Sequence, residues 1–475
     1  MSRKEGSRMS LHTWSLRHIA QAVRSGEMSA VTVTRYFLQR IDLWNSSLKA
    51  FIISSDNALE QAAAMDALRN SGKDPGPLAG VPIAIKDLLD TEGIQTTYGG
   101  RHHVHIPDFS APVVTLLQQA GAIVIGKTNL HEYAYGTTTE NPHYGISRNP
   151  WNINKISGGS SGGNGVALAA GLCLGAVGTD TGGSIRIPAA LCGTVGLKPT
   201  YGLVSKRGVF PLAKSLDHVG PMANSVADVA VLLSVLAGYD SLDPDSCQSP
   251  ARKYPALLPQ TLRIGLPKQY FYDRCHPNLL QVIQTAFKNL REHLSPELNH
   301  WVELEIPLMV EVPEAQRVLI TSEARAVHNL WLKSHPALYG EDVRTRLMEA
   351  DDIRGDQYVW AAQVRRDFTA AMEQVFEQVD VLLTPTTPIP ATNIGQVKTH
   401  VHTHEVNVRS HLTRNTHPWN LTGLPALTIP CGFTHDGLPV GLQIIGPKFS
   451  EPKLLSIGKL FEQILVYPGI APAYR

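Results

Sequence analysis

The feature that most constrains this chain is a pair of glycine-rich blocks that each contain serine. The first block, residues 158–163, reads GGSSGG, and the second, residues 178–184, reads GTDTGGS, so Ser184 follows Ser160 by 24 positions. Glycine lets backbone N–H groups turn towards a bound molecule without steric cost. A serine hydroxyl becomes a nucleophile when a base removes its proton and backbone amides stabilise the oxyanion. Together the blocks offer a nucleophile, a relay hydroxyl and a donor-rich loop.

Two other interpretations of the blocks are weaker. Runs of serine and glycine often form linkers. A phosphate-binding loop would end in Gly-Lys-Ser/Thr, whereas Asn164 follows Gly163. Upstream, Lys86 ends the apolar run 81–85, and burial there would disfavour its charged form and make it a base. A lysine after a strand is usually a surface residue, but the two serine blocks favour the base.

These motifs resemble the amidase signature family over nearly the whole chain. The resemblance implies an amidase of the 3.5.1 type, which hydrolyses linear carboxamides through an acyl-enzyme and releases ammonia or an amine. The matching stretches are 80–87, 147–152, 158–165, 178–188, 192–200 and 215–221, with weaker matches at 423–432 and 437–443.

The resemblance also implies a role for each catalytic residue. Ser184 is the nucleophile, Ser160 bridges it to Lys86, and Lys86 is the base. The peptide before the bridging serine, Gly159–Ser160, is expected to be cis, and Ser161 is the competing choice for the bridge. The implied oxyanion hole consists of the backbone amides of Thr181, Gly182, Gly183 and Ser184.

The remaining site residues are predicted with less support from motifs. Asp180 and Arg186, six positions apart across the second block, are expected to pair and brace it, and Asp217 is given a similar structural role. An aromatic wall would suit apolar or aryl amides, although such aromatics are as often part of a core. The predicted substrate-binding residues are Tyr135, Gly136, Thr137 and Trp419, with Tyr133 and Asn420 as further candidates.

The main alternative function is that of the glutaminase A subunit of a tRNA-dependent amidotransferase, which works with partner chains and tRNA. Thr413 and Arg414 stand roughly where that glutaminase carries an aspartate for glutamine's amino group, and residues 331–336 lack its tyrosine-bearing segment. Arg346 is a candidate counterpart of its carboxylate-binding arginine. The C-terminal half looks more like free-standing amidases, and ureas, carbamates or esters stay open as substrates. A catalytically dead scaffold is disfavoured because all three catalytic residues are present.

Composition narrows the class of partner. Lysine and arginine number 42 and aspartate and glutamate 41, so the net charge of +1 gives no reason to expect nucleic acid. Five scattered cysteines without CxxC pairs predict reduced thiols and a cytoplasmic protein. The polar N-terminus lacks a signal-peptide core, and no apolar run is long enough to predict a membrane span. We expect a small-molecule amide as the partner and leave a homodimer open.

No cofactor and no metal are predicted. His400, His402 and His404 would share one face of a strand and could hold Zn²⁺ adventitiously, but apart from Glu405 no carboxylate or thiol completes a site. A serine–histidine–aspartate triad is not needed, although His218 would be the next base to test.

Alternating strand and helix patterns predict the fold. We expect an α/β fold in which a large mixed, mostly parallel central sheet carries helices on both faces. Residues 1–71 are predicted as a helical segment packed on one α/β unit, 72–475, whose motif core is about 81–240. The predicted strands are 81–85, 122–125, 174–177, 379–383, 426–429 and 442–445, and the predicted helices 111–119, 165–173, 226–237, 276–294 and 355–378.

Overall fold

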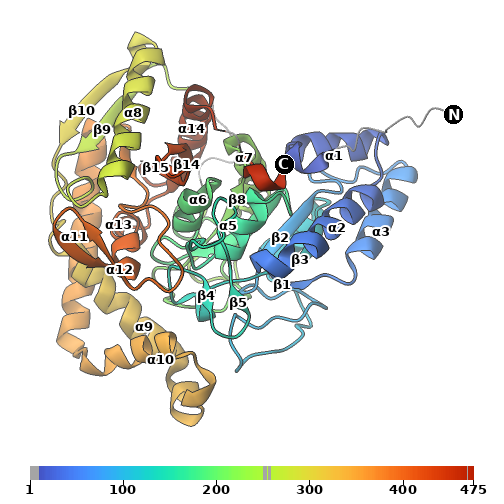
Figure 1. Ribbon diagram of the computed structural model, residues 1–475, viewed down its shortest axis with the longest axis horizontal. Coiled ribbons are helices and arrows are strands. Elements are labelled where there is room, and N and C mark those ends of the chain that lie inside the picture. The colour runs from blue at the N-terminus through green and yellow to red at the C-terminus, as the bar shows by residue number, and fades with distance from the viewer. Residues whose placement is uncertain (1–9, 250–253, 255–257, 468) are drawn as a thin grey trace.

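The centre of the molecule is a single sheet of 11 strands in a computed structural model that describes residues 10–249, 254, 258–467 and 469–475 (Figure 1). Residues 1–9, on which the prediction about a signal peptide rests, lie outside the described residues. The strand order is β1-β3-β2-β6-β8-β7-β14-β15-β11-β9-β10. These strands are β1 (Phe51–Ser54), β2 (Pro82–Lys86), β3 (Ile123–Thr128), β6 (Gly175–Asp180), β7 (Val195–Lys198), β8 (His218–Ala223), β9 (Arg263–Pro267), β10 (His300–Leu304), β11 (Val381–Pro385), β14 (Ala426–Phe433) and β15 (Pro439–Ile445).

The α/β class and the mixed sheet are confirmed, but the sheet is not mostly parallel. Strand β2 runs parallel to β3 and β6, and β9 runs parallel to β10 and β11, whereas the other neighbours in the described sheet are antiparallel. One cause is that β14 and β15 are joined by the short turn 434–438, and a connection this short permits only antiparallel pairing. The expected return of the C-terminal strands to the same sheet does occur.

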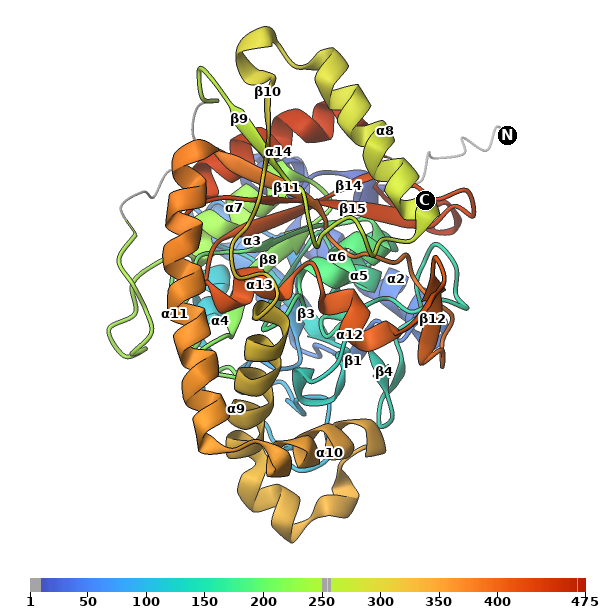
Figure 2. The ribbon, with the colours of Figure 1, turned by 90° about the vertical axis from the view of Figure 1, so that its left-hand side faces the viewer.

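Helices pack against this sheet on both sides (Figure 2). Helices α5 and α6 contact each other and the strands next to them, while α14 contacts α7, α8 and β14. The helices are α1 (Leu16–Ser25), α2 (Ala30–Leu48), α3 (Ala58–Asn70), α4 (Pro112–Gln119), α5 (Gly162–Ala169), α6 (Arg186–Cys192), α7 (Val226–Leu236), α8 (Pro277–His293), α9 (Val312–Ser334), α10 (Glu341–Met348), α11 (Gly355–Gln378), α12 (Val408–Thr413), α13 (His417–Leu421) and α14 (Glu451–Leu465). No helix in the described ranges is both long and apolar enough to cross a membrane.

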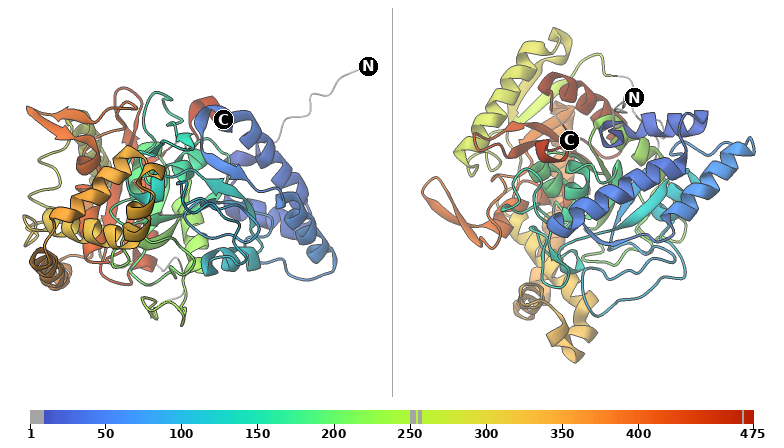
Figure 3. Two further views of the ribbon diagram at one scale, coloured as in Figure 1. Left: turned by 90° about the horizontal axis from the view of Figure 1, so that it is seen from below. Right: turned by 45° about the vertical axis from the view of Figure 1, so that its right-hand side comes forward.

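The N-terminal segment is less purely helical than predicted. Helices α1 to α3 lie at one end of the molecule (Figure 3), but residues 51–54 form β1, which pairs antiparallel with β3. Lys49 ends α2 in the left-handed conformation, and the Asn45 side chain accepts a hydrogen bond from the Phe51 N–H at 2.8 Å. This turn directs the apolar residues after Lys49 along the sheet edge, so the helical prediction is wrong there.

Two features of the architecture place the candidate site. Strands β2 and β6 are parallel neighbours, so Lys86 and Asp180, their last residues, lie at the same edge of the sheet. On the C-terminal side of the chain, α9 and α11 run side by side and α10 connects to them at the bottom of Figure 2. Two minor hairpins, β4 (Glu140–Asn141) with β5 (Gly145–Ile146) and β12 (Lys398–Val401) with β13 (His404–Asn407), lie outside the main sheet.

Candidate active site

Lys86 is completely buried at the end of β2 and contacts two hydroxyl groups. Its Nζ donates to Ser160 Oγ at 2.7 Å and to Thr179 Oγ1 at 2.8 Å. Burial lowers the pKa of Lys86 to about 7, although the carboxylates of Asp180 and Asp217 act in the opposite direction. A large share of this amine is therefore neutral near pH 7, and a neutral amine can accept a proton.

The two serine blocks meet beside this lysine. The Ser161 N–H donates to the Ser184 carbonyl at 3.1 Å, and the Gly159–Ser160 peptide is cis, as the resemblance implies. Ser161 points its hydroxyl elsewhere, because Oγ donates to the Thr179 carbonyl at 3.2 Å. The geometry therefore favours Ser160 over Ser161 as the partner of Lys86. Ser184 is 7% exposed, whereas Ser160 and Lys86 are fully covered.

The loop after β6 presents backbone amides in two different ways. Thr181, Gly182 and Ser184 line a cavity, and within the described chain their N–H groups form no hydrogen bond. Gly183 does not line it, and its N–H donates to Asp180 Oδ1 at 2.8 Å. The prediction that Gly183 is an oxyanion donor is therefore wrong, because its amide already has a partner. Glycine is still required there, because φ is +132° and a Cβ would lie 2.3 Å from Thr416 Oγ1.

Asp180 and Arg186 brace this loop, as predicted. Both are fully buried, and Arg186 donates to the two Asp180 carboxylate oxygens at 3.0 and 2.8 Å. Burial alone would raise the pKa of Asp180, but Arg186 more than offsets it and holds that pKa below its usual range. Arg186 also donates to Asn420 and Gln443, so the loop is tied to β15 and α13.

The cavity beside Ser184 has a volume of about 400 Å³. One wall comes from the loop after β6, another from α9, α10 and α12, and residues 134–137 also line the cavity. Gln316 of α9 joins the two walls, because its Nε2 donates to the Thr181 carbonyl at 3.1 Å. Sequence reasoning missed the α9 residues and Arg409 of α12, since helical periodicity alone predicts a packing face rather than a ligand site.

The predicted substrate-binding residues divide into two groups. Tyr135, Gly136 and Thr137 line the cavity. Trp419 does not: it is fully covered, stacks on Phe271 with ring centroids 5.6 Å apart, and donates its indole N–H to the Asn415 carbonyl at 3.0 Å. Its assignment to the pocket is corrected to the core, where a large ring with a satisfied N–H is well placed. Tyr133 is also fully buried.

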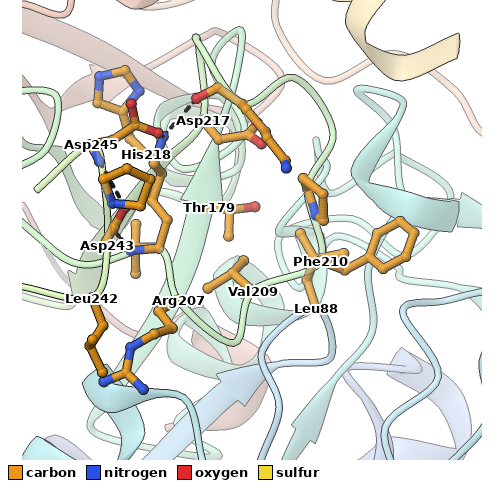
Figure 4. Close-up of a pocket in the computed structure, with 15 residues that line it drawn as sticks. Leu88, Thr179, Arg207, Val209, Phe210, Asp217, His218, Leu242, Asp243 and Asp245 are labelled. Carbon is orange, nitrogen blue, oxygen red and sulfur yellow. Dashed lines mark hydrogen bonds and ion pairs between the residues drawn. The ribbon is translucent and has the colours of Figure 1, made fainter. Parts of the chain in front are cut away.

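A second cavity, of about 300 Å³, lies next to the residues that surround Lys86 (Figure 4). Thr179 and Asp217 line this cavity. The Thr179 hydroxyl accepts the hydrogen bond from Lys86, and the Asp217 carboxylate accepts one from the Thr181 hydroxyl at 2.6 Å. Burial raises the pKa of Asp217 to about 6. His218 also lines this cavity, and its Nδ1 lies 2.7 Å from the Leu216 carbonyl oxygen. Burial keeps the pKa of His218 well below the usual range. His218 contacts none of the three catalytic candidates through a hydrogen bond in the described structure.

The histidine hairpin does not gather a metal-binding set. His400 and His404 lie on β12 and β13, with His402 in the turn between them. Among the described residues, no group of three histidine, cysteine, aspartate or glutamate side chains could hold a metal ion. All five cysteines are free thiols.

Comparison with known proteins shows which family this chain resembles. A family profile described as Amidase matches residues 32–455. The chain is 39% identical over 482 residues to the A subunit of glutamyl-tRNA(Gln) amidotransferase from Marinomonas sp. (strain MWYL1), an alignment that covers 94% of this chain and 96% of that protein.

Solved structures agree with this placement. One, described as an unexpected vestigial protein complex that reveals the evolutionary origins of an s-triazine catabolic enzyme, is 33% identical, covers 96% of this chain and 99% of its own, and has a TM-score of 0.88. The peptide amidase from Stenotrophomonas maltophilia is 31% identical, covers 98% and 99%, and has a TM-score of 0.83. The chain therefore belongs to the amidase signature family of amide hydrolases, as its motifs indicate.

Proposed function

We propose that this protein hydrolyses a linear carboxamide through Ser184, Ser160 and Lys86. The observation that carries the proposal is the fully buried Lys86 amine, which lies 2.7 Å from Ser160 Oγ and whose pKa burial lowers to about 7. A lysine in this state is suited to accept a proton, and Ser184 lines the adjoining cavity.

The reaction begins when Ser184 Oγ attacks the amide carbonyl and its proton passes through Ser160 to neutral Lys86. The free amides of Thr181, Gly182 and Ser184 stabilise the oxyanion, since such donors act strongly where water is excluded. Lys86 then returns the proton through Ser160 to the leaving nitrogen. Ammonia or an amine departs, and water hydrolyses the acyl-enzyme by the same relay.

The second candidate is a glutamine-hydrolysing component of a tRNA-dependent amidotransferase. The observation in its favour is the 39% identity to such a protein over almost the whole chain. Against it, Thr413 lines the cavity where that relative is expected to carry an aspartate, and Thr413 Oγ1 donates to the Ser410 carbonyl at 3.0 Å. A threonine provides no negative charge for the glutamine ammonium group.

An amide panel tested on the purified chain alone separates these functions. We expect ammonia or amine release without any partner, and a fluorophosphonate probe should attach to Ser184. Glutamine hydrolysis that appears only after partner subunits are added would support the second candidate. An inert chain that the probe does not label would contradict the proposal.

A further inference from the structure

The cavity beside Ser184 contains three arginines, of which two are neutralised within the protein. Arg317 donates to both carboxylate oxygens of Glu314, at 2.8 and 2.7 Å. Arg346, 3% exposed, donates through Nε to Asp342 at 3.1 Å and forms an ion pair with it. Each of these guanidinium groups therefore has its own carboxylate.

Arg409 differs from the other two. It is partly buried, and within the described ranges its side chain forms no hydrogen bond and no ion pair. A guanidinium has five N–H donors, and burying it without partners is costly. The Glu349 carboxylate attracts it only through space, and burial lowers the pKa of Arg409. Burial and the repulsion from Arg409 also lower the pKa of Arg346 to about 9.

Arg409 leaves an uncompensated positive charge on the cavity wall, close enough to the Asp342-paired guanidinium of Arg346 to repel it. Arg346 Nη1 is buried without a hydrogen-bond partner, which adds a second unsatisfied donor group on this wall. Two like charges held together destabilise each other, and a bound anion would relieve the repulsion and supply acceptors.

The cavity provides no corresponding site for a positive group. Glu314 is the carboxylate among its described lining residues, and Arg317 occupies both of its oxygens. The remaining wall contains apolar side chains such as Ala134, Leu212 and Ile320. These surfaces suit a short hydrocarbon chain, and about 400 Å³ is in the range of small-molecule sites.

We propose, on the basis of the proposed amide hydrolysis, that the substrate is a small amide with a carboxylate at its other end and no ammonium group, and that Arg409 binds the carboxylate. Arg346, although paired with Asp342, supports it with the unpartnered donor group Nη1. Arg409 then sets specificity, while Ser184 performs the same chemistry on any amide that reaches it.

Three matched amides test this proposal. Glutaramate carries the carboxylate, glutaramide is its neutral diamide, and glutamine is glutaramate with an added ammonium group. We expect kcat/KM for glutaramate to exceed the other two by on the order of 10–100-fold, the effect of a hydrogen bond to a charged group. Arg409→Gln should remove this preference mainly through KM, and Arg409→Lys should restore part of it.

The control variant is Arg317→Gln combined with Glu314→Gln, which removes a paired arginine of the same cavity together with its carboxylate and leaves the net charge of the cavity unchanged. It should keep the preference for glutaramate. A second readout needs no turnover: glutarate should slow fluorophosphonate labelling of the wild-type protein more than glutaramide does, and this protection should be lost in Arg409→Gln.

The experiments distinguish a failure of the proposed carboxylate subsite from a failure of the proposed amide hydrolysis. Equal hydrolysis of glutaramate and glutaramide, or no protection by glutarate, would overturn the carboxylate subsite and leave amide hydrolysis standing. Faster hydrolysis of glutamine than of glutaramate would overturn the exclusion of an ammonium group. Absence of both labelling and hydrolysis across the whole amide panel would instead overturn the proposed function.

Discussion

The two walls of the cavity differ in how they are built. The wall after β6, with Thr181, Gly182 and Ser184, comes from one short stretch, and Asp180 and Arg186 fix it through buried hydrogen bonds. The other wall comes mainly from three helices, α9, α10 and α12, all of which lie far along the sequence from the loop after β6. Their side chains make few hydrogen bonds to the first wall within the described structure, and Gln316 is the one from α9 to Thr181.

This difference suggests that the loop wall carries out the reaction and that the helix wall selects the substrate. A rigid wall with preorganised donors can stabilise the same transition state for every amide. A wall of helix side chains can change which amide binds without disturbing that machinery. Changes in the first wall should therefore lower kcat for all substrates, and changes in the second should act on KM for particular ones.

The largest effect is expected for Ser184→Ala. Loss of the nucleophile should lower kcat by on the order of 10⁴–10⁶-fold on every amide, as for other hydrolases that depend on one serine. Ser161→Ala is the matched control, because Ser161 is as buried but donates only to the Thr179 carbonyl. Steady-state ammonia release measures both. If kcat fell by a comparable factor in both variants, the assignment of Ser184 as the nucleophile would be contradicted.

Lys86→Ala should cause the next largest loss of activity, and the size of this loss should depend on pH. Only the neutral amine accepts a proton, so wild-type activity should rise with pH and level off above a pKa of about 7. The variant should lose this acid limb together with most amidase activity, and should retain more activity on activated esters, whose leaving groups need less protonation.

The control for the pH profile is His218→Gln. Burial keeps the pKa of His218 well below its usual range, so its titration does not fall near pH 7. An acid limb that survives in Lys86→Ala and disappears in His218→Gln would reverse the assignment of the base.

Sequence reasoning reached the first wall but only part of the second, where Arg346 and Thr413, named through the family resemblance, do line the cavity. The pairing of Asp180 with Arg186 and the strands that carry Lys86 and Asp180 were predictable, because short motifs and apolar runs determine them locally. Arg409 and Gln316 were missed because a polar residue on a helix shows no local sign of the cavity that tertiary packing creates. The same limit explains β1, where the Asn45 side chain and Lys49 redirect a segment that looks helical.

Gln316→Ala tests the contact between the walls. Removing its hydrogen bond to the Thr181 carbonyl should loosen the oxyanion loop and lower kcat by about 2–10-fold, the range for one ordinary hydrogen bond. The reduction should be similar for all amides. Thr321→Ala, on the same helix and lining the same cavity but not bonded to the loop, is the control and should leave kcat unchanged. A loss specific to one substrate would place Gln316 in the selecting wall instead.

The smallest effect on activity is expected for Trp419→Phe. Trp419 is fully buried, and its indole N–H donates to the Asn415 carbonyl, which Gln443 also contacts. Losing this bond and part of the ring should cost about 1–3 kcal/mol of unfolding free energy and leave KM within about twofold of wild type. Denaturant unfolding and steady-state kinetics measure the two quantities. Tyr135→Ala, which removes a ring that lines the cavity, should instead raise KM. A raised KM in Trp419→Phe at unchanged stability would return Trp419 to the substrate site and show that the selecting wall extends to α13.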